Sequence, residues 1–467
     1  MNPGKIALMV LCIICAPFAS STVFVEWSSP TLPTASLLGI KDIVLSWGPG
    51  ISASWVAAAR KQGYNVYVET PLEQATPAAK ACAKTRCAGI ILNARESEST
   101  DTDKFLASLR SAYPKLRFLV LNPNGKQPEM KGSLIIKRDS VLEVSSPTAQ
   151  PWIDTNLALV KVEQRSRSQQ VPLYTFSWSE NGQQRNLNAT DYSLAVAEAG
   201  AFHADLLLRL DAHLQEALNS RNSEAWALWG EVGSMLKFSS RESVSGLVPA
   251  ANVAVIVDNL DTSDEVLNLL SRHNIPFQIF LPADLKTHPL KGFDIVILYA
   301  KTDSGIGEQI SGLAADGATV VVVDAHGKYP WQGARAIQVN EHTISYAVGD
   351  GKVLELAEPV TDPETFAQDI RRLLGKQNSL LSLWNGLTTV AVPYKDDSGA
   401  LKLLEFVNYA DDPLGIQVQV KGSFATVRYE TPERGCCQSI EPVRHDGFTE
   451  FVIPELRITG RVYLESR

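Results

Sequence analysis

Between residues 22 and 240 the chain repeats one pattern, in which a short apolar run is followed by a stretch with helical periodicity. Runs such as Tyr64–Glu69 and Ala88–Asn93 are apolar almost throughout, whereas a strand with one solvent-exposed face would alternate apolar and polar residues. Continuous runs of this kind are typical of parallel strands that helices cover on both faces. The predicted strands are Val23–Trp27, Asp42–Trp47, Tyr64–Glu69, Ala88–Asn93, Arg117–Asn122, a pair around Leu134–Ile136 and Val141–Val144, Leu173–Trp178 and Asp205–Leu210. Eight such positions indicate a TIM-type (β/α)8 barrel over residues 22–248.

The end of this region has two interpretations. Asp205–Leu210 fits an eighth strand, but Leu206–Leu218 also fits a helical period. In the first case Asp211 and His213 follow a strand and are weak site candidates. In the second case they belong to the polar face of a helix.

A second pattern begins after Pro249. Strands and helices alternate again up to about residue 350, which indicates a flavodoxin-like doubly wound unit over residues 249–350. The turn after its first strand, Asn259–Ser263, lacks a glycine-rich phosphate loop, so no dinucleotide cofactor is expected. Short strands and turns over residues 351–467 indicate a small antiparallel β-sandwich.

The first 21 residues predict an export signal. Lys5 precedes the apolar run Ile6–Ala19, and small residues follow, so we expect cleavage near Ser21/Thr22 and a periplasmic or extracellular protein. An uncleaved anchor is the alternative. No other run is apolar enough to predict a membrane span. The formal net charge of −8 argues against a nucleic-acid partner.

Four cysteines lie outside the predicted signal: Cys82, Cys87, Cys436 and Cys437. In an oxidising compartment Cys82 and Cys87 are able to close a small disulfide loop, whereas the adjacent Cys436 and Cys437 are awkward to pair with each other. The spacings are not those of zinc fingers, and no metal site is predicted.

The order signal peptide, barrel, flavodoxin-like unit and β-sandwich resembles glycoside hydrolases of the β-galactosidase type. The resemblance implies a catalytic barrel, a trimerisation domain shaped like a class I glutamine amidotransferase, and therefore self-association through the middle domain. No cysteine occurs between residues 88 and 435, which excludes the amidotransferase nucleophile. Asp324 and His326 are therefore interpreted as hydrogen-bonding loop residues.

The family resembled here has an Asn-Glu pair after its fourth strand and a Glu after its seventh. This chain has Asn93-Ala94-Arg95-Glu96 and Ser177-Trp178-Ser179-Glu180 at the corresponding places. Glu96 and Glu180 stand near those places without matching the motif, so the family's catalytic roles are not carried over.

Polar and aromatic residues at strand ends are the site candidates, because barrel enzymes work at the carboxyl ends of their strands. Glycoside hydrolysis needs two carboxyl groups, and the candidates for them are Glu26, Glu69 and Glu143. The candidate substrate-binding residues are Trp27, Trp47, Asn93, Asn122, Trp152, Asp154 and Trp178. For each acid alone a salt bridge is the alternative, and core packing or turn formation is the alternative for the others.

Two functions remain open from the sequence. The first is an exported glycoside hydrolase that acts on a carbohydrate through two carboxylates. The second is a non-catalytic carbohydrate-binding or assembly protein on the same scaffold. Fold alone does not choose between them, because function depends on the site.

Overall fold

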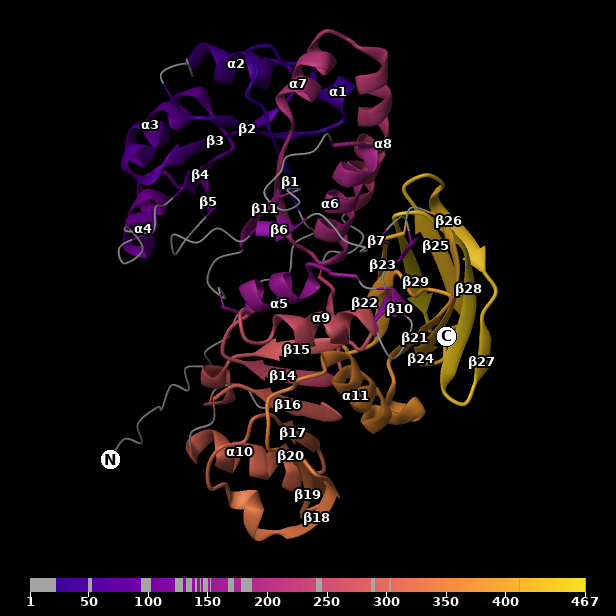
Figure 1. Cartoon of the computed structure of the whole chain (residues 1–467). Helices are drawn as coiled ribbons and strands as arrows, with labels where there is room; N and C mark the ends of the chain where they lie inside the picture. The colour runs from indigo at the N-terminus through magenta and orange to yellow at the C-terminus, as the bar shows by residue number, and fades with distance from the viewer. Residues whose placement is uncertain are drawn as a thin grey trace, which may run out of the picture.

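The computed structural model describes residues 22–48, 53–93, 102–121, 129–131, 137–138, 141–142, 144–145, 150–151, 153–166, 172–177, 187–240, 246–286, 290–301, 304–410 and 412–466. Three parts follow one another along the chain: a curled parallel sheet with helices, a second α/β unit, and antiparallel sheets that lie beside both (Figure 1). The predicted signal peptide, residues 1–21, lies outside the described residues.

The first part is a parallel sheet in barrel order. Its strands are β1 (Val23–Glu26), β2 (Asp42–Ser46), β3 (Asn65–Pro71), β4 (Gly89–Asn93), β5 (Arg117–Val120), β6 (Glu129–Lys131), β11 (Leu173–Ser177) and β12 (Asp205–Arg209). They pair in the order β5-β4-β3-β2-β1-β12-β11-β6. Because the first strand pairs with the last, the sheet curls as a TIM barrel does, and the predicted fold class is confirmed.

Helices cover the outside of this sheet. They are α1 (Ala35–Leu38), α2 (Ala53–Lys61), α3 (Ala75–Thr85), α4 (Thr102–Ala112), α5 (Leu157–Ser166), α6 (Ala189–Ala201), α7 (Ala212–Asn219) and α8 (Ser223–Ser239). A capping box between Asn188 and Asp191 starts α6. The carboxylate of Asp211 accepts hydrogen bonds from the backbone N–H groups of His213 and Leu214, so α7 begins only after β12 has ended. Asp205–Arg209 is therefore the eighth strand, and the helix begins only after it, at Ala212.

The sixth strand differs from the prediction. The sequence indicated a pair around Leu134–Ile136 and Val141–Val144, but the strand that pairs with β11 is Glu129–Lys131. Leu134–Ile136 lies outside the described residues. A three-residue strand whose one buried apolar residue is Met130 produces no apolar run, which is why the sequence pattern missed it. Further along, β7 (Lys137–Arg138) and β8 (Val141–Leu142) form a separate antiparallel pair, and so do β9 (Val144–Ser145) and β10 (Gln150–Pro151).

The middle part is doubly wound. Its sheet has the order β15-β14-β16-β17-β20-β19-β18, and the first five of these strands are parallel. The strands are β14 (Val253–Val257), β15 (Phe277–Phe280), β16 (Ile295–Tyr299), β17 (Thr319–Val322), β18 (Arg335–Asn340), β19 (Thr343–Val348) and β20 (Gly351–Leu356), and the helices are α9 (Asp264–Arg272), α10 (Ser304–Ala315) and α11 (Pro363–Asn378). Because β20 pairs with β17, this sheet continues beyond residue 350.

The last part is a sandwich of a six-stranded and a four-stranded antiparallel sheet. The six-stranded sheet runs β13 (Val248–Pro249), β22 (Thr389–Lys395), β23 (Leu401–Asn408), β29 (Thr459–Glu465), β25 (Thr426–Thr431) and β26 (Gly435–Ile440). The four-stranded sheet runs β21 (Leu381–Trp384), β24 (Leu414–Lys421), β28 (Phe448–Leu456) and β27 (Val443–His445). Side chains such as Phe406 and Val418 fill the space between the two sheets.

The sandwich is joined to the barrel by buried polar contacts as well as by packing. Tyr394 donates to the carbonyl of Ala201 at the end of α6 at 2.6 Å, and Arg461 donates to the carbonyl of Phe238 in α8 at 2.7 Å. Arg461 is also paired with Glu405 at 2.7 Å, and both side chains are buried. Within the described ranges, no helix combines the length and the apolar character that crossing a membrane requires.

Candidate active site

One arginine holds two of the predicted acids together at the carboxyl end of the barrel. The Nε atom of Arg209, the last residue of β12, lies 2.7 Å from Oε2 of Glu26 in β1. Its Nη2 atom lies 3.3 Å from Oε1 of Glu69 in β3. Two carboxylates from different strands therefore meet at one guanidinium group.

The alternation of side chains along each strand explains why these groups meet. Strand residues such as Phe24, Tyr67 and Leu207 form a cluster that contains strand residues and two residues adjoining the strands but no helix residue, which places them inside the barrel. Residues two positions further along a strand point to the same side. Glu26, Glu69 and Arg209 each follow one of these interior residues by two, so all three face the barrel interior at its carboxyl end.

Two further polar side chains complete the site. The amide of Asn93, at the end of β4, donates to Oε1 of Glu69 at 3.1 Å. The hydroxyl of Ser46, at the end of β2, lies 3.4 Å from Oε1 of Glu26. Four neighbouring strands and β12 thus each contribute one polar group to the same end of the barrel, as expected for the working face of this fold.

The environment of Glu69 favours its protonated form. Burial raises the pKa of the Glu69 carboxyl, and the nearby charge of Glu26 raises it further. Arg209 and the hydrogen bond from Asn93 oppose that shift without cancelling it. A carboxyl group with a raised pKa next to a second carboxylate is the arrangement from which general acids are built.

Two of the predicted substrate-binding tryptophans, Trp27 and Trp47, belong to or pack against the helix-side core of the barrel and lie apart from the interior residues. Trp27 is fully buried on the helix side of the sheet, and its indole N–H donates to the carbonyl of Thr31 at 2.8 Å. Trp27 follows the inward-facing Glu26 by one residue, so its side chain points outward and away from the barrel interior, where the paired carboxylates lie. Trp47 also packs partly buried against the helix-side core.

Asp154 lies away from the carboxyl end of the barrel. It precedes α5, and its Oδ1 atom accepts a 3.0 Å hydrogen bond from Asn268 of α9 in the middle part. One partner of Asp154 is thus a residue of the neighbouring middle part. The candidates Glu143, Asn122, Trp152 and Trp178 lie outside the described residues, as do Glu96 and Glu180.

Four other polar residues singled out in the sequence take part in local hydrogen bonds or ion pairs. Asp211 caps α7, and His213 lies exposed in the first turn of that helix. Asp324 and His326 pair with each other at 2.8 Å on the surface of the middle part.

The four cysteines behave unlike the expectation. Cys82 and Cys87 are buried free thiols joined by a hydrogen bond, which lowers the pKa of the Cys87 thiol to about 7. Cys436 and Cys437, expected to pair poorly, form the disulfide.

Sequence reasoning missed Arg209, which organises the site. The signal was present, because Leu206-Leu207-Leu208 ends in an arginine just as Phe24-Val25 ends in Glu26. Two inward-facing acids require a cation to balance them, and Arg209 is the cation at the end of a strand that pairs with β1.

Fold and candidate site together consist of a curled parallel barrel sheet with paired carboxylates at its carboxyl end, followed by a doubly wound domain and a β-sandwich. No protein-family model and no curated protein matches the chain. Solved structures do. The chain is similar to α-L-fucosidase isoenzyme 2 from Paenibacillus thiaminolyticus, with a TM-score of 0.58 and 12% identity over 96% of this chain and 100% of that one.

It is also similar to a β-galactosidase from Bacillus circulans sp. alkalophilus, with a TM-score of 0.52 and 11% identity over 96% of this chain and 99% of that one. At such identities the likeness concerns the fold. It extends over 96% of this chain in both comparisons and shows that the chain shares the fold of these two structures.

Proposed function

We propose that this protein is an exported glycoside hydrolase in which Glu69 is the proton donor and Glu26 is the second carboxylate. The observation that carries the proposal is the pairing of both acids with Arg209 at the carboxyl end of a glycosidase-type barrel. The raised pKa of Glu69 suits a group that protonates a leaving-group oxygen.

Within this proposal the residues have separate roles. Glu69 holds the proton and delivers it to the glycosidic oxygen. The carboxylate of Glu26 stabilises positive charge on the sugar ring, either by attacking it or by activating water. Arg209 and Asn93 act on Glu69 by orienting it, and are positioning residues.

A second function is favoured by the same arginine. Both acids are already ion-paired with Arg209, and such a satisfied cluster also suits a protein that binds sugar hydroxyls without cleaving the chain. In that case the three side chains provide hydrogen-bonding partners and no proton transfer takes place.

Product release separates the two functions. The mature protein, Glu69→Gln and Glu26→Gln are incubated with a panel of oligo- and polysaccharides, and products are identified by mass spectrometry. Glu216→Gln is the control, because Glu216 is an exposed carboxylate on α7. A hydrolase loses its activity in the two site variants and keeps it in the control. Binding to a glycan without any product supports the second function.

Export and self-association belong to the same proposal. Amino-terminal sequencing is expected to show that the exported protein begins near Thr22.

In the middle part the edge strand β18 exposes Ile337 and Val339, each 57% exposed, and an exposed apolar edge is a natural place for a second chain to bind. Sedimentation should show an oligomer that Ile337→Lys dissociates, and a wild-type monomer would contradict this part.

A further inference from the structure

The disulfide between Cys436 and Cys437 lies on an edge of the sandwich. Both cysteines belong to β26, which is the edge strand of the six-stranded sheet and, among the described residues, pairs with β25 alone. Cys436 is exposed and Cys437 is half-buried. The bond is therefore accessible to a reagent in solution.

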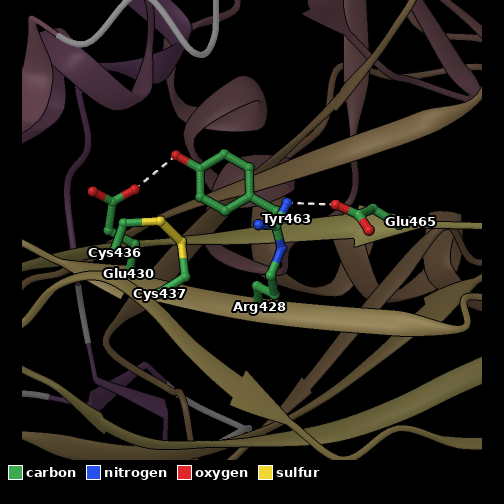
Figure 2. The surroundings of a disulfide bond; sticks show 6 residues. All are labelled: Arg428, Glu430, Cys436, Cys437, Tyr463 and Glu465. Atoms are coloured by element: carbon green, nitrogen blue, oxygen red, sulfur yellow. Dashed lines mark hydrogen bonds and ion pairs between the residues drawn. A yellow bond between two sulfur atoms is a disulfide. The ribbon is translucent and has the colours of Figure 1, made fainter.

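A buried carboxylate lies next to this disulfide. Glu430 of β25 is 1% exposed, and one of its carboxylate oxygens and the two sulfur atoms all lie within 4.8 Å of one another. Figure 2 shows the carboxylate beside the two sulfurs, facing the ring of Tyr463. Carboxylate and thiolate groups gathered this closely are able to share one cation.

A second layer of contacts holds the carboxylate in place. The hydroxyl of Tyr463 donates to Oε2 of Glu430 at 2.7 Å. The guanidinium of Arg428 lies 5.9 Å from the centre of the Tyr463 ring and is ion-paired with Glu465 (Figure 2). Hydrogen bonds of this kind to a ligating carboxylate are a regular feature of metal sites.

We propose that Cys436, Cys437 and Glu430 form a redox-gated site for a thiophilic divalent cation such as Zn²⁺ or Cd²⁺. In the oxidised protein the sulfurs are bonded to each other and provide no thiolate. After reduction the two sulfurs next to the Glu430 carboxylate become available as thiolates, so that two thiolates, one carboxylate and solvent make up a four-coordinate shell. The site is separate from the carboxylates at the barrel end and does not depend on the proposed hydrolase function.

The gating step is a thiol–disulfide exchange with a dithiol as reductant. The dithiol loses two electrons and two protons and becomes a disulfide, while the Cys436–Cys437 bond breaks and gives two thiols. Binding of the cation then releases the two thiol protons to solvent, since the thiolate is the ligand. The cation itself is neither oxidised nor reduced.

Cadmium titration of the mature chain, which lacks residues 1–21 and with them Cys12 and Cys15, tests the proposal. Cys82→Ala and Cys87→Ala are introduced together, because those two thiols form the other cysteine pair. The protein is reduced with dithiothreitol, freed of reductant without oxygen, and titrated with Cd²⁺ while the ultraviolet thiolate-to-cadmium absorption is recorded. We expect one Cd²⁺ per reduced chain, none per oxidised chain, and loss of the absorption in Cys436→Ser. Equal binding before and after reduction would overturn the proposal.

Glutamate variants test the third ligand. Glu430→Gln should weaken Cd²⁺ binding by about tenfold or more, whereas Glu465→Gln, which changes a neighbouring exposed carboxylate, should leave the affinity unchanged. Tyr463→Phe, which keeps the ring and removes only its hydrogen bond to Glu430, should weaken binding by less than Glu430→Gln does, and it serves as the test if Glu430→Gln fails to fold. Wild-type affinity in both Glu430→Gln and Tyr463→Phe, or equal losses in Glu430→Gln and Glu465→Gln, would contradict a role for Glu430.

Discussion

The hydroxyl of Tyr409 donates a 2.5 Å hydrogen bond to Oε1 of Glu198, joining the β-sandwich to helix α6 of the barrel. The backbone N–H of Asn156 donates to the same oxygen at 3.2 Å, and the Asn156 amide donates to Oε2 at 2.6 Å. Glu198 is 1% exposed, and burial raises its pKa to about 7 despite these three hydrogen bonds. The domains are thus connected through a carboxyl group that titrates near neutrality.

This carboxyl predicts a pH dependence of stability. Because its pKa is higher in the folded than in the unfolded chain, the folded state binds more protons between pH 4.5 and about pH 7, and the Glu198 contribution to stability falls as pH rises through that window. The shift corresponds to a loss on the order of 3 kcal/mol. Glu198→Gln should flatten the dependence of the denaturation midpoint on pH between pH 4.5 and pH 7. An unchanged slope in this variant would contradict the assignment.

A buried ion pair at the same interface predicts a large loss of stability. Arg461 and Glu405 are each 1% exposed, so Arg461→Met leaves an uncompensated buried carboxylate and should cost about 3–5 kcal/mol. The exposed pair of Arg434 and Glu455 is the comparison, and Arg434→Met should cost less than about 1 kcal/mol. Denaturant unfolding measures both. Similar losses in the two variants would contradict the role given to burial.

The close packing around Gly89 of the barrel predicts that a substitution by alanine destabilises the protein. A Cβ atom on Gly89 of β4 would overlap the carbonyl oxygen of Arg117 and lie 2.7 Å from the ring of Tyr67. Gly89→Ala should therefore destabilise the protein by about 1–3 kcal/mol. Gly230 of α8 has open space at its Cβ position, so Gly230→Ala should stabilise it by roughly 0.5–1 kcal/mol. Thermal unfolding of the two variants is the test: steric overlap predicts a loss of stability in Gly89→Ala alone, whereas similar losses in both variants would contradict it.

Substitution of Arg209 in the candidate site should impair function while changing the stability of the protein very little. Arg209 is 46% exposed, so its ion pairs with Glu26 and Glu69 are screened by solvent, and Arg209→Gln should change stability by less than about 1 kcal/mol. Loss of the positive charge should raise the pKa of Glu69 further, since Arg209 opposes that shift. Glycan turnover or binding should fall at least tenfold. A variant with wild-type function would show that Arg209 does not organise the site.

The barrel strands were largely predictable because each fully covered strand is a continuous apolar run. The exception is Glu129–Lys131, where pairing with β11 determines a strand that three residues alone do not reveal. The eighth strand was ambiguous because Leu206–Leu218 fits both periods, and the cap formed by Asp211 is what separates strand from helix.

The site was predictable in part. Glu26 and Glu69 were predicted as candidates because they end strands, and strand parity alone places Trp27 on the opposite side of the sheet from its neighbour Glu26. The contact between Arg209 and both acids was not predictable, because it depends on the register that places Arg209 opposite Glu26 across the closure of β1 on β12. The residues of β1 and β12 alone do not determine that register.

The pH dependence of product release from a cleavable glycan tests the central claim most directly. If Glu69 is the proton donor, the rate should fall as pH rises through the raised pKa of Glu69, and Glu69→Gln should lack both the activity and this alkaline limb. The same alkaline limb in the residual activity of Glu69→Gln, or no product from any glycan at any pH, would contradict the account.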